Sequence, residues 1–520
     1  MTYACRRCCL LFCLIALTST PLHAEVQVAE VIHAHAVLQR DKPIPVWGIA
    51  EAGEQVAVEF AGQRRSTTAD AFGRWRVELN AMPMSLEPRD LTITGSATAR
   101  PLVVPSVRLG DVWLKIIGRT SMADVAGMEE QLVKNAAGDA PLFSVRNVWN
   151  AHEVVRPKQT FTNQLNRRYW EPYVPRMNKY FTGSGYVWAR HWWDHDLRVP
   201  LGLYRIEPGE LMDMTPPAGF ATVPALKAVA EQVAPWDPNS PAGRKAFAAK
   251  LAEIAAWSQR LHAQLKADDT TFRDVNQPPT LPGPKGERGQ PTTRYNDAVH
   301  PLVGSAIRGV VIYIPRIGLG DDRYADKMTA LVNGLRIVFR DPQLPVCLLQ
   351  SPRPHSYELI DKPADAVTNL RDQQASLADI EGVSVVGTYD LQRTRNHRDP
   401  SDWANRLAKW SRLQVTGQGT TSPRYVGHRI DGRRVIVQAD EQLTIGDGDA
   451  DADVGGFVIA GADKVWHPAV ATIEGDTIVV TSDEAPSPVA VRYAYENVPE
   501  TANLANHAGM PLLPFRTDEW

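Results

Sequence analysis

The sequence has little cysteine, and almost all of it lies at one end. Of the five cysteines, only Cys347 lies beyond the first 24 residues. Those residues hold two arginines, the short apolar run 8–17 and small residues up to Ala24, a pattern typical of a secretory signal peptide. We expect cleavage before Glu25 and a periplasmic or secreted protein. A single cysteine excludes an internal disulfide, so burial of apolar side chains must stabilise the mature chain.

Long apolar runs and an excess of basic residues are also lacking. The run 8–17 is too short to span a bilayer, and no apolar run of sufficient length follows it. Without the two arginines of the signal peptide, the 56 Lys and Arg become 54 against 59 Asp and Glu, a net charge of −5. This balance argues against nucleic acid and against a membrane as partners. The glycine-rich stretches lack the Lys-Ser/Thr of a phosphate loop, and we expect no cofactor.

Alternating apolar residues near both ends of the chain predict small β domains. Val56, Val58 and Phe60 alternate with polar neighbours. The stretches RRVIVQ, DTIVVTS and PVAVRYAY near the C-terminus are short strand patterns separated by Gly and Pro turns. We therefore expect one β domain over residues 25–107 and another over residues 419–520.

The centre of the chain has the pattern of a parallel α/β sheet. Apolar runs of the kind that form buried parallel strands alternate with helical spacing, as at Met328, Leu331 and Leu335. Helical spacing between Leu226 and Leu265, followed by a Pro- and Gly-rich linker, predicts an insertion in this core. The strand-like runs cover residues 199–206, 307–314, 344–350 and 383–391.

Several stretches resemble the sialate O-acetylesterase family, secreted carbohydrate esterases with an SGNH-hydrolase core. They are HAVLQRDKPIPVWGIAEAGEQVAVEFAG (35–62), LGDVWL (109–114), RYNDAVHPLVGSAIRGVVIY (294–313), GFVIAGADKVWHPAVATIEGDTIVV (456–480) and NHAGMPLLPFRTDEW (506–520). The resemblance implies an α/β fold, with an SGNH-type three-layer core and a parallel sheet, flanked by N- and C-terminal β domains and interrupted by a helical insertion. The expected parts are the signal peptide 1–24, the N-terminal β domain 25–107, the first part of the core 108–215, the helical insertion and linker 216–293, the second part of the core 294–418 and the C-terminal β domain 419–520.

The first family block carries the nucleophile. The resemblance implies an attacking serine, a histidine base with an acidic partner, and donors for an oxyanion. After the strand at 112–117 the family has Gly-Gln-Ser-Asn-Met, whereas residues 118–122 of this chain are GRTSM. With Met122 as anchor, Thr120 falls on the serine and Ser121 on the asparagine donor. Threonine can attack an ester, but its extra methyl group crowds the attack. As ordinary turn hydroxyls, both residues would have no catalytic role.

The second and third family blocks depart as well. Where the family has Gly-Gly-Thr-Pro after the second strand, residues 205–210 of this chain are RIEPGE. The side chain of Glu210 would bring negative charge to a developing oxyanion. Where the family has Gln-Gly-Glu-Ser-Asn after the third strand, residues 314–318 are IPRIG, with Arg316 at the position of the glutamate. The polar groups of the family's pocket are therefore absent from both blocks.

The fourth block keeps its histidine but not the acid beside it. The family has Asp-x-x-His, and this chain has TRNHRDP over residues 394–400. His397 is retained, Arg395 falls near the place of the acid, and Asp399 on the other side could substitute for it. A histidine base loses orientation and charge stabilisation without a carboxylate partner. His397 could equally be a histidine of a surface loop.

Two stretches have the spacing of a metal site but lack its ligands. Residues 446–456, GDGDADADVGG, have alternating aspartates like a calcium loop, but Ala452 and Val458 stand where glycine and glutamate are required. His191 and His195 are four residues apart with no third ligand in view, which favours a helix with aromatic packing. We expect no metal.

Two functional hypotheses follow. In the preferred one, the protein is a catalytically inactive or severely impaired carbohydrate-esterase homologue that binds a carbohydrate or serves as a structural protein, which favours a role other than catalysis. In the alternative, it is an active carbohydrate O-acetylesterase in which Thr120 or Ser121 attacks, His397 is the base and Asp399 orients it.

Arginines in the altered blocks suggest a ligand for the first hypothesis. Arg119, Arg205, Arg316 and Arg395 each fall in a stretch that matches a catalytic block. Guanidinium groups bind carboxylates well, so a cationic site here would hold an anionic sugar such as sialic acid or a uronate. The ordinary alternative is that these arginines point to solvent or pair with nearby acids, for which Glu207, Glu210, Asp321 and Asp399 are available.

Overall fold

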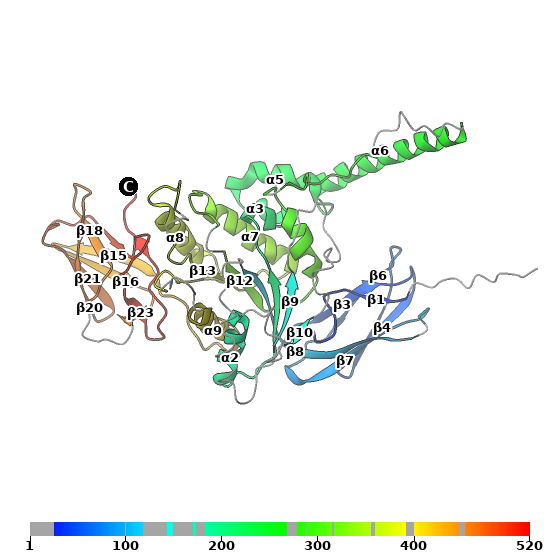
Figure 1. Ribbon diagram of the computed structural model, residues 1–520, viewed down its shortest axis with the longest axis horizontal. Coiled ribbons are helices and arrows are strands. Elements are labelled where there is room, and N and C mark those ends of the chain that lie inside the picture. Colours follow the sequence, from blue (N-terminus) through cyan, green and yellow to red (C-terminus); the bar gives the residue numbers. More distant parts are fainter. Residues whose placement is uncertain are drawn as a thin grey trace, which may run out of the picture.

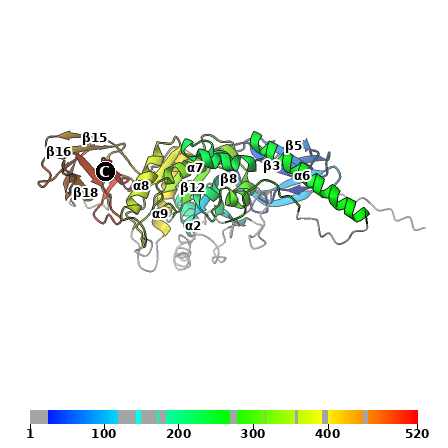
Figure 2. The same cartoon turned by 90° about the horizontal axis from the view of Figure 1, so that it is seen from above.

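The structure is a computed structural model. It describes residues 25–98, 100–117, 143–148, 170–172, 183–267, 278–287, 289–314, 317–354, 359–391, 400–446 and 453–520. The predicted signal peptide, residues 1–24, lies outside the described residues. Three parts follow one another along the long axis, with the N-terminal β domain at one end, an α/β core in the middle and the C-terminal β domain at the other end (Figures 1 and 2).

A mostly parallel sheet forms the core, as the apolar runs predict. Its strand order is β10-β9-β11-β8-β12-β13-β14, and all neighbouring pairs are parallel except β10 with β9. All four strand-like runs form strands of this sheet. The strands are β8 (Leu102–Ile117), β9 (Phe143–Val148), β10 (Glu171–Pro172), β11 (Leu201–Ile206), β12 (Gly309–Tyr313), β13 (Val346–Leu349) and β14 (Val383–Val386).

Helices cover both faces of this sheet. Side chains alternate between the faces along a strand, so Leu114 and Ile116 of β8 join one apolar cluster and Trp113 and Ile117 join another. The first cluster includes α7 (Tyr324–Phe339) and α8 (Ala366–Ser376), and the second includes α2 (Gly183–Asp194) and α9 (Pro400–Thr416). This arrangement of helix, sheet and helix agrees with the α/β prediction; its assignment to the SGNH type stays a prediction.

A group of tryptophans fixes α2 and α9 to the sheet. The ring of Trp113 lies 5.4 Å from that of Trp188 on α2 and 5.4 Å from that of Trp410 on α9, measured between centroids. The indole nitrogens of Trp188 and Trp192 both donate to the buried hydroxyl of Ser411, at 2.7 and 3.0 Å. Aromatic pairs of this kind stabilise a core beyond the area that they bury.

The N-terminal β domain shares a strand with the core. Val56, Val58 and Phe60 are buried, as their alternation predicts. β8 pairs antiparallel with β7 in its first half and parallel with β11 and β12 in its second half. The predicted boundary between residues 107 and 108 therefore falls inside one continuous strand. The other main strands are β3 (Ile44–Ile49), β4 (Gln55–Phe60), β5 (Gln63–Thr68), β6 (Arg74–Leu79) and β7 (Ser85–Gly95).

The C-terminal β domain has its own apolar core, centred on residues such as Val437, Ile459 and Tyr493. Two four-stranded sheets enclose this core, with strand orders β15-β16-β21-β20 and β19-β18-β22-β24. The strands are β15 (Tyr425–Asp431), β16 (Arg434–Ala439), β18 (Phe457–Ala460), β19 (Trp466–Pro468), β20 (Val470–Glu474), β21 (Thr477–Thr481), β22 (Ala490–Tyr493) and β24 (Phe515–Arg516).

The insertion between β11 and β12 is helical, as its spacing predicts. It contains the short helices α3 (Leu211–Met214), α4 (Pro217–Phe220) and α5 (Lys227–Val233) and the long helix α6 (Pro241–Lys266). The short helices pack on α7 through a small apolar cluster that includes Phe220, Leu226 and Ala330.

The junction of the N-terminal domain and the core is built around one buried carboxylate. Asp111 of β8 is fully buried and accepts hydrogen bonds from Arg40 at 3.0 and 3.2 Å, from Arg308 at 2.8 and 2.9 Å, and from Gln39 at 3.1 Å. Arg40 and Gln39 follow β2 (Val37–Gln39), and Arg308 directly precedes β12. Donors from two parts of the chain thus satisfy both carboxylate oxygens.

We expect Asp111→Asn to lower the free energy of unfolding by about 3–5 kcal/mol, because it leaves two partly buried guanidinium groups without their anion. Asp41→Asn is the matched control, since Asp41 approaches the same two arginines at 3.0 and 3.6 Å but is 48% exposed. Urea unfolding of both variants measures the difference. Equal losses in the two variants would contradict the central role of Asp111.

Candidate functional site

The four altered sequence blocks follow strands that end at one edge of the core sheet. β8, β11, β12 and β14 are parallel, so their carboxyl ends point to the same edge. In open α/β sheets ligands bind outside this edge. The first three blocks begin directly after Ile117, near Ile206 and after Tyr313, and the fourth lies between β14 and α9. The described strand ends that precede these blocks in the sequence therefore lie at one edge of the sheet.

Most residues predicted for the site lie outside the described residues. These are Arg119, Thr120, Ser121, Arg316, Arg395, His397 and Asp399. Their catalytic and ligand-binding roles stay predictions. Of the predicted site residues, Arg205 alone belongs to the described part of the chain.

Arg205 lies inside the sheet, beside a lysine that sequence reasoning missed. It is 2% exposed and is the register partner of Lys115 on β8, which is fully buried. The Lys115 ammonium lies 5.2 Å from the centre of the Trp403 ring of α9. Burial lowers the pKa of Lys115 well below its usual range, and the charge of Arg205 lowers it further. A lysine within the apolar run VWLKII was the signal available in the sequence. Two basic side chains thus lie in the layer below the carboxyl edge.

A second buried polar group supports the loop after β11. Asp213 of α3 is 1% exposed, and its carboxylate lies 3.9 Å from Nε of Arg294. Gly209 packs directly on this pair, because a Cβ atom there would come within 2.4 and 2.5 Å of the Asp213 oxygens. The loop therefore requires glycine at this position. Glu210, which the sequence places near a developing oxyanion, is exposed at the start of α3.

Polar residues after β13 and β14 are tied to one another and to the C-terminal domain. The Thr388 hydroxyl donates to the carbonyl of Gln350 at 2.6 Å. The buried guanidinium of Arg371 donates to Ser351 O at 3.1 Å and to Glu496 O of the C-terminal domain at 2.8 Å. Burial lowers the pKa of Arg371 to about 10, still well above neutral. These contacts brace the edge of the sheet against the C-terminal domain.

A cleft of about 960 Å³ opens beside Leu391 and Asp402, which flank the fourth block in the sequence. It lies between α9, the loop after β14 and the C-terminal domain. Arg406 forms a bidentate pair with Asp390 at 2.5 and 2.7 Å, and Arg353 pairs with Glu500 across the cleft at 3.0 Å. The side chain of Asn405 also lines it. Paired charges and amide groups offer both donors and acceptors, which suits the hydroxyl groups of a sugar.

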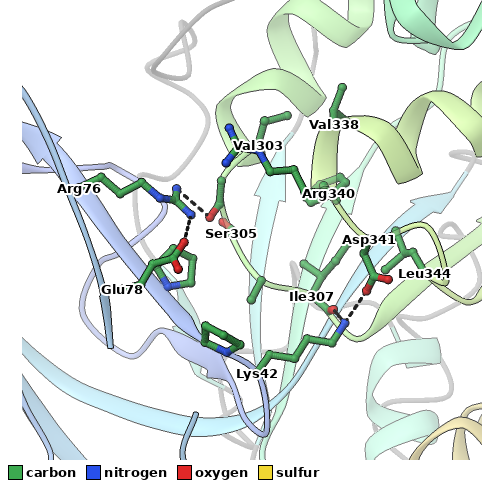
Figure 3. A pocket seen from close by; sticks show the side chains of 15 residues that line it. Lys42, Arg76, Glu78, Val303, Ser305, Ile307, Val338, Arg340, Asp341 and Leu344 are labelled. Atoms are coloured by element: carbon green, nitrogen blue, oxygen red, sulfur yellow. Dashed lines mark hydrogen bonds and ion pairs between the residues drawn. The ribbon is translucent and has the colours of Figure 1, made fainter. Parts of the chain in front are cut away.

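A second pocket lies at the opposite end of the sheet. Its volume is about 340 Å³, and it is lined by residues that include Ile307 and Leu344, which lie two residues before β12 and β13 (Figure 3). Lys42 donates there to Ile307 O at 2.8 Å and to Asp341 at 2.7 Å. Because the pocket is at the amino ends of the strands, we do not assign the predicted chemistry to it.

Of the predicted histidine pair, His191 lies on α2, as the aromatic spacing of that stretch indicates, and His195 directly follows the helix. The rings of His191 and His195 stack at 4.2 Å, and Nδ1 of His195 lies 2.8 Å from the carbonyl of His191. Among the described residues, no group of three or more His, Cys, Asp or Glu side chains could hold a metal ion. The aspartates of the calcium-like stretch, Asp447, Asp449 and Asp451, lie outside the described residues. Within the described ranges, no helix is both long and apolar enough to cross a membrane.

Comparison with known proteins gives a fold match over nearly the whole chain. The structure superposes on that of a carbohydrate acetylesterase from Xanthomonas citri with a TM-score of 0.72 and 25% sequence identity, covering 95% of this chain and 100% of that one. The chain has the fold of a carbohydrate acetylesterase. This match agrees with the resemblance to carbohydrate esterases that the sequence shows. Specificity for sialate stays a prediction.

Other likenesses are weak. A protein from Arabidopsis thaliana matches with a TM-score of 0.26 and 11% identity, covering 59% of this chain and 99% of that one. A putative glycoside hydrolase from Bacteroides vulgatus matches with a TM-score of 0.20 and 7% identity, covering 90% and 99%. Both TM-scores are too low to indicate a shared fold. No protein-family model and no curated sequence matches the chain.

We expect His191 to make this acetylesterase fold less stable in mild acid. Burial, and then the charge of His195, lower the pKa of His191 from 6.5 to about 4. Between these values the unfolded chain binds a proton at this residue and the folded chain does not, so stability falls as the pH falls from about 6.5 to 4. His191→Gln should therefore lose less Tm between pH 7 and pH 5 than the unmodified protein.

His262→Gln is the matched control for this measurement. His262 is exposed on α6, and its ring nitrogen makes the same kind of contact, 2.9 Å from the carbonyl four residues earlier. It should keep the pH dependence of the unmodified protein. A His191→Gln variant with an unchanged pH dependence would show that His191 is not the group responsible.

Proposed function

We propose that the protein is an exported carbohydrate-esterase homologue that has lost most of its hydrolytic activity and binds an anionic sugar. The observation that supports the proposal is that β8, β11, β12 and β14, from which the four altered blocks continue in the sequence, direct their carboxyl ends to one edge of the sheet. Departures scattered over the fold could be neutral, whereas departures at one edge affect one reaction centre. The nucleophile, the acid partner and the oxyanion donors of the family pattern would be altered together. Loss of such groups costs several orders of magnitude in rate, although the individual effects do not add.

An anionic sugar is the ligand class that the local charges favour. Arg119, Arg316 and Arg395 occupy three of the altered blocks in the sequence. Arg205 adds positive charge in the layer directly below the same edge. Charge in a layer shielded from water acts more strongly on a carboxylate than the same charge in solvent does. The neighbouring cleft, with its paired Arg406 and Asp390, supplies polar groups for hydroxyls.

The likeness to an acetylesterase over the full chain favours the alternative, an active carbohydrate O-acetylesterase. In that reaction the hydroxyl of Thr120 or Ser121 would attack the acetyl carbonyl, and His397 would take its proton and give it to the sugar oxygen as the ester C–O bond breaks. Water would then hydrolyse the acetyl-enzyme, with His397 as base, and release acetate. Asp399 would orient the histidine. Backbone N–H groups near Gly209 are the donors in this part of the chain that could face the oxyanion.

We expect the mature protein to release acetate from a chromogenic acetate ester and from acetylated sialic acid no faster than a Thr120→Ala, Ser121→Ala double variant. The reason is that neither hydroxyl is activated when the base lacks the acid of the family pattern. Stopped-time measurement of acetate and of chromophore gives both rates. Turnover well above that of the double variant, and lost in His397→Ala, would instead establish the active esterase.

For binding, calorimetric titration with sialic acid at low and high salt should show heat that weakens as salt rises, because the attraction is between charges. Arg316→Ala, Arg395→Ala should abolish it. Arg429→Ala, Arg433→Ala is the matched control, since these arginines are exposed on the C-terminal domain and pair with Asp431 and Asp483. No heat and no thermal shift at millimolar sialic acid or glucuronate would rule out the anionic-sugar site.

A further inference from the structure

Helix α6 stands apart from the apolar cores of the described residues. It has 26 residues and begins with a capping hydrogen bond from Gly243 N to the Ser240 hydroxyl, at 2.8 Å. It packs on the short helix η3 (Ala234–Trp236) that directly precedes it. None of its apolar side chains belongs to a hydrophobic cluster of the described structure. Figure 1 shows α6 running outward from the core as an arm.

The apolar side chains of this arm follow a heptad spacing. Counting along the helix, they recur at steps of four, three, four, three and four residues, with one polar member. The positions are Phe247, Leu251, Ile254, Ser258, Leu261 and Leu265, which we call the α6 seam. This spacing gives a narrow stripe that matches the contact line of a left-handed coiled coil. Leu251 is 56% exposed and Leu265 is 50% exposed, so the seam is open at these positions.

We propose that α6 forms an antiparallel coiled coil with α6 of a second copy of this chain. The seam is symmetric about residue 256, so a two-fold axis there brings each seam position opposite another seam position. Phe247 of one copy then faces Leu265 of the other, Leu251 faces Leu261, and Ile254 faces Ser258. A surface that is complementary to itself is what a two-fold dimer requires.

The position of the arm selects the antiparallel direction. A helix of 26 residues is about 39 Å long, so antiparallel pairing holds the two cores at opposite ends of the coiled coil. Parallel pairing would bring both cores to the same end and stack Ser258 against Ser258. Antiparallel pairing packs each Ser258 on Ile254. It also sets the two helix dipoles side by side in opposite directions, which is the favourable arrangement.

The distribution of charged and apolar side chains on α6 favours a second copy of the chain over a membrane surface as the partner. The helix carries Arg244, Lys245, Lys250, Arg260 and Lys266 against Glu253 alone. A basic helix can bind anionic lipid, but such helices have a wide apolar face opposite a strongly polar one. In α6 the side opposite the narrow seam is rich in alanine, as at Ala249, Ala252, Ala256 and Ala263. Two basic arms repel each other, so the dimer should become stronger as salt screens the charges.

Sedimentation velocity of the mature, full-length protein tests the proposal. The expected weight-average mass rises from that of one chain toward that of two across roughly 1–100 μM, because a contact of this size is small for a stable interface. The rise should occur at lower protein concentration in high salt than in low salt. A single-chain mass throughout this range at both salt concentrations would overturn the proposal.

Matched substitutions locate the contact. Leu251→Gln, Leu265→Gln should keep the protein monomeric, because it removes two apolar members of the α6 seam. Ala252→Gln, Ala263→Gln introduces the same side chains at exposed positions off the seam and should leave the dimer unchanged. Equal effects of the two double variants would show that the seam is not the interface.

Cysteine crosslinking tests the direction and does not depend on the Gln variants. The single cysteine of the mature chain, Cys347, is buried and will not compete. When a Leu251→Cys chain and a differently tagged Leu261→Cys chain are mixed and oxidised, the mixed disulfide should predominate. Predominance of Leu251→Cys homodimers would establish a parallel pair and overturn the antiparallel one. Binding of anionic phosphatidylserine vesicles by a chain that stays monomeric would assign α6 to a membrane surface instead.

Discussion

A fully buried carboxylate fixes the longest strand of the core at the point where that strand passes from the N-terminal domain into the parallel sheet. Asp111 lies where β8 leaves the N-terminal β domain and enters the parallel sheet, and its oxygens accept hydrogen bonds from Arg40 and Arg308. A charge without solvent must be matched by donors, so the segments that bring these donors are fixed relative to β8. Arg40 directly follows β2, and Arg308 directly precedes β12. The domain boundary is therefore a rigid joint and not a linker.

The continuity of β8 also decides where chemistry can occur. Because one strand passes through both parts, the N-terminal domain covers the amino ends of the parallel strands and the pocket of Figure 3 lies at that junction. Among the described residues, the loop at Gly209 and the cleft beside α9 belong to the side of the carboxyl ends. The C-terminal domain is anchored at this second edge by Arg371, whose donors reach Ser351 on one side and Glu496 on the other.

Local patterns were sufficient to predict most of the fold. The four apolar runs form strands, and the heptad-like spacing around Ile254 forms a helix, because burial and periodicity are properties of short segments. The burial of Lys115 and Arg205 could not be predicted in this way. Their placement depends on the register of β8 with β11 and on the packing of Trp403, which are long-range contacts. The helical spacing predicts α6 itself, but it does not show that no apolar core of the described structure covers the α6 seam.

The interactions that stabilise this fold are separate from those that the family reaction needs. Trp113, Trp188 and Trp410 pack on one face of the sheet, and Asp111 lies two residues before Trp113 on β8, at the junction with the N-terminal domain, so neither group depends on a nucleophile or a base. Substitutions in the loops after the strands therefore change the reaction centre at little cost in packing. The buried Asp213 below Gly209 constrains the loop after β11, because a Cβ atom at residue 209 would meet its carboxylate. A fold of this construction can keep its shape and its clefts while its chemistry is lost, which is the physical basis for a binding protein built on an esterase scaffold.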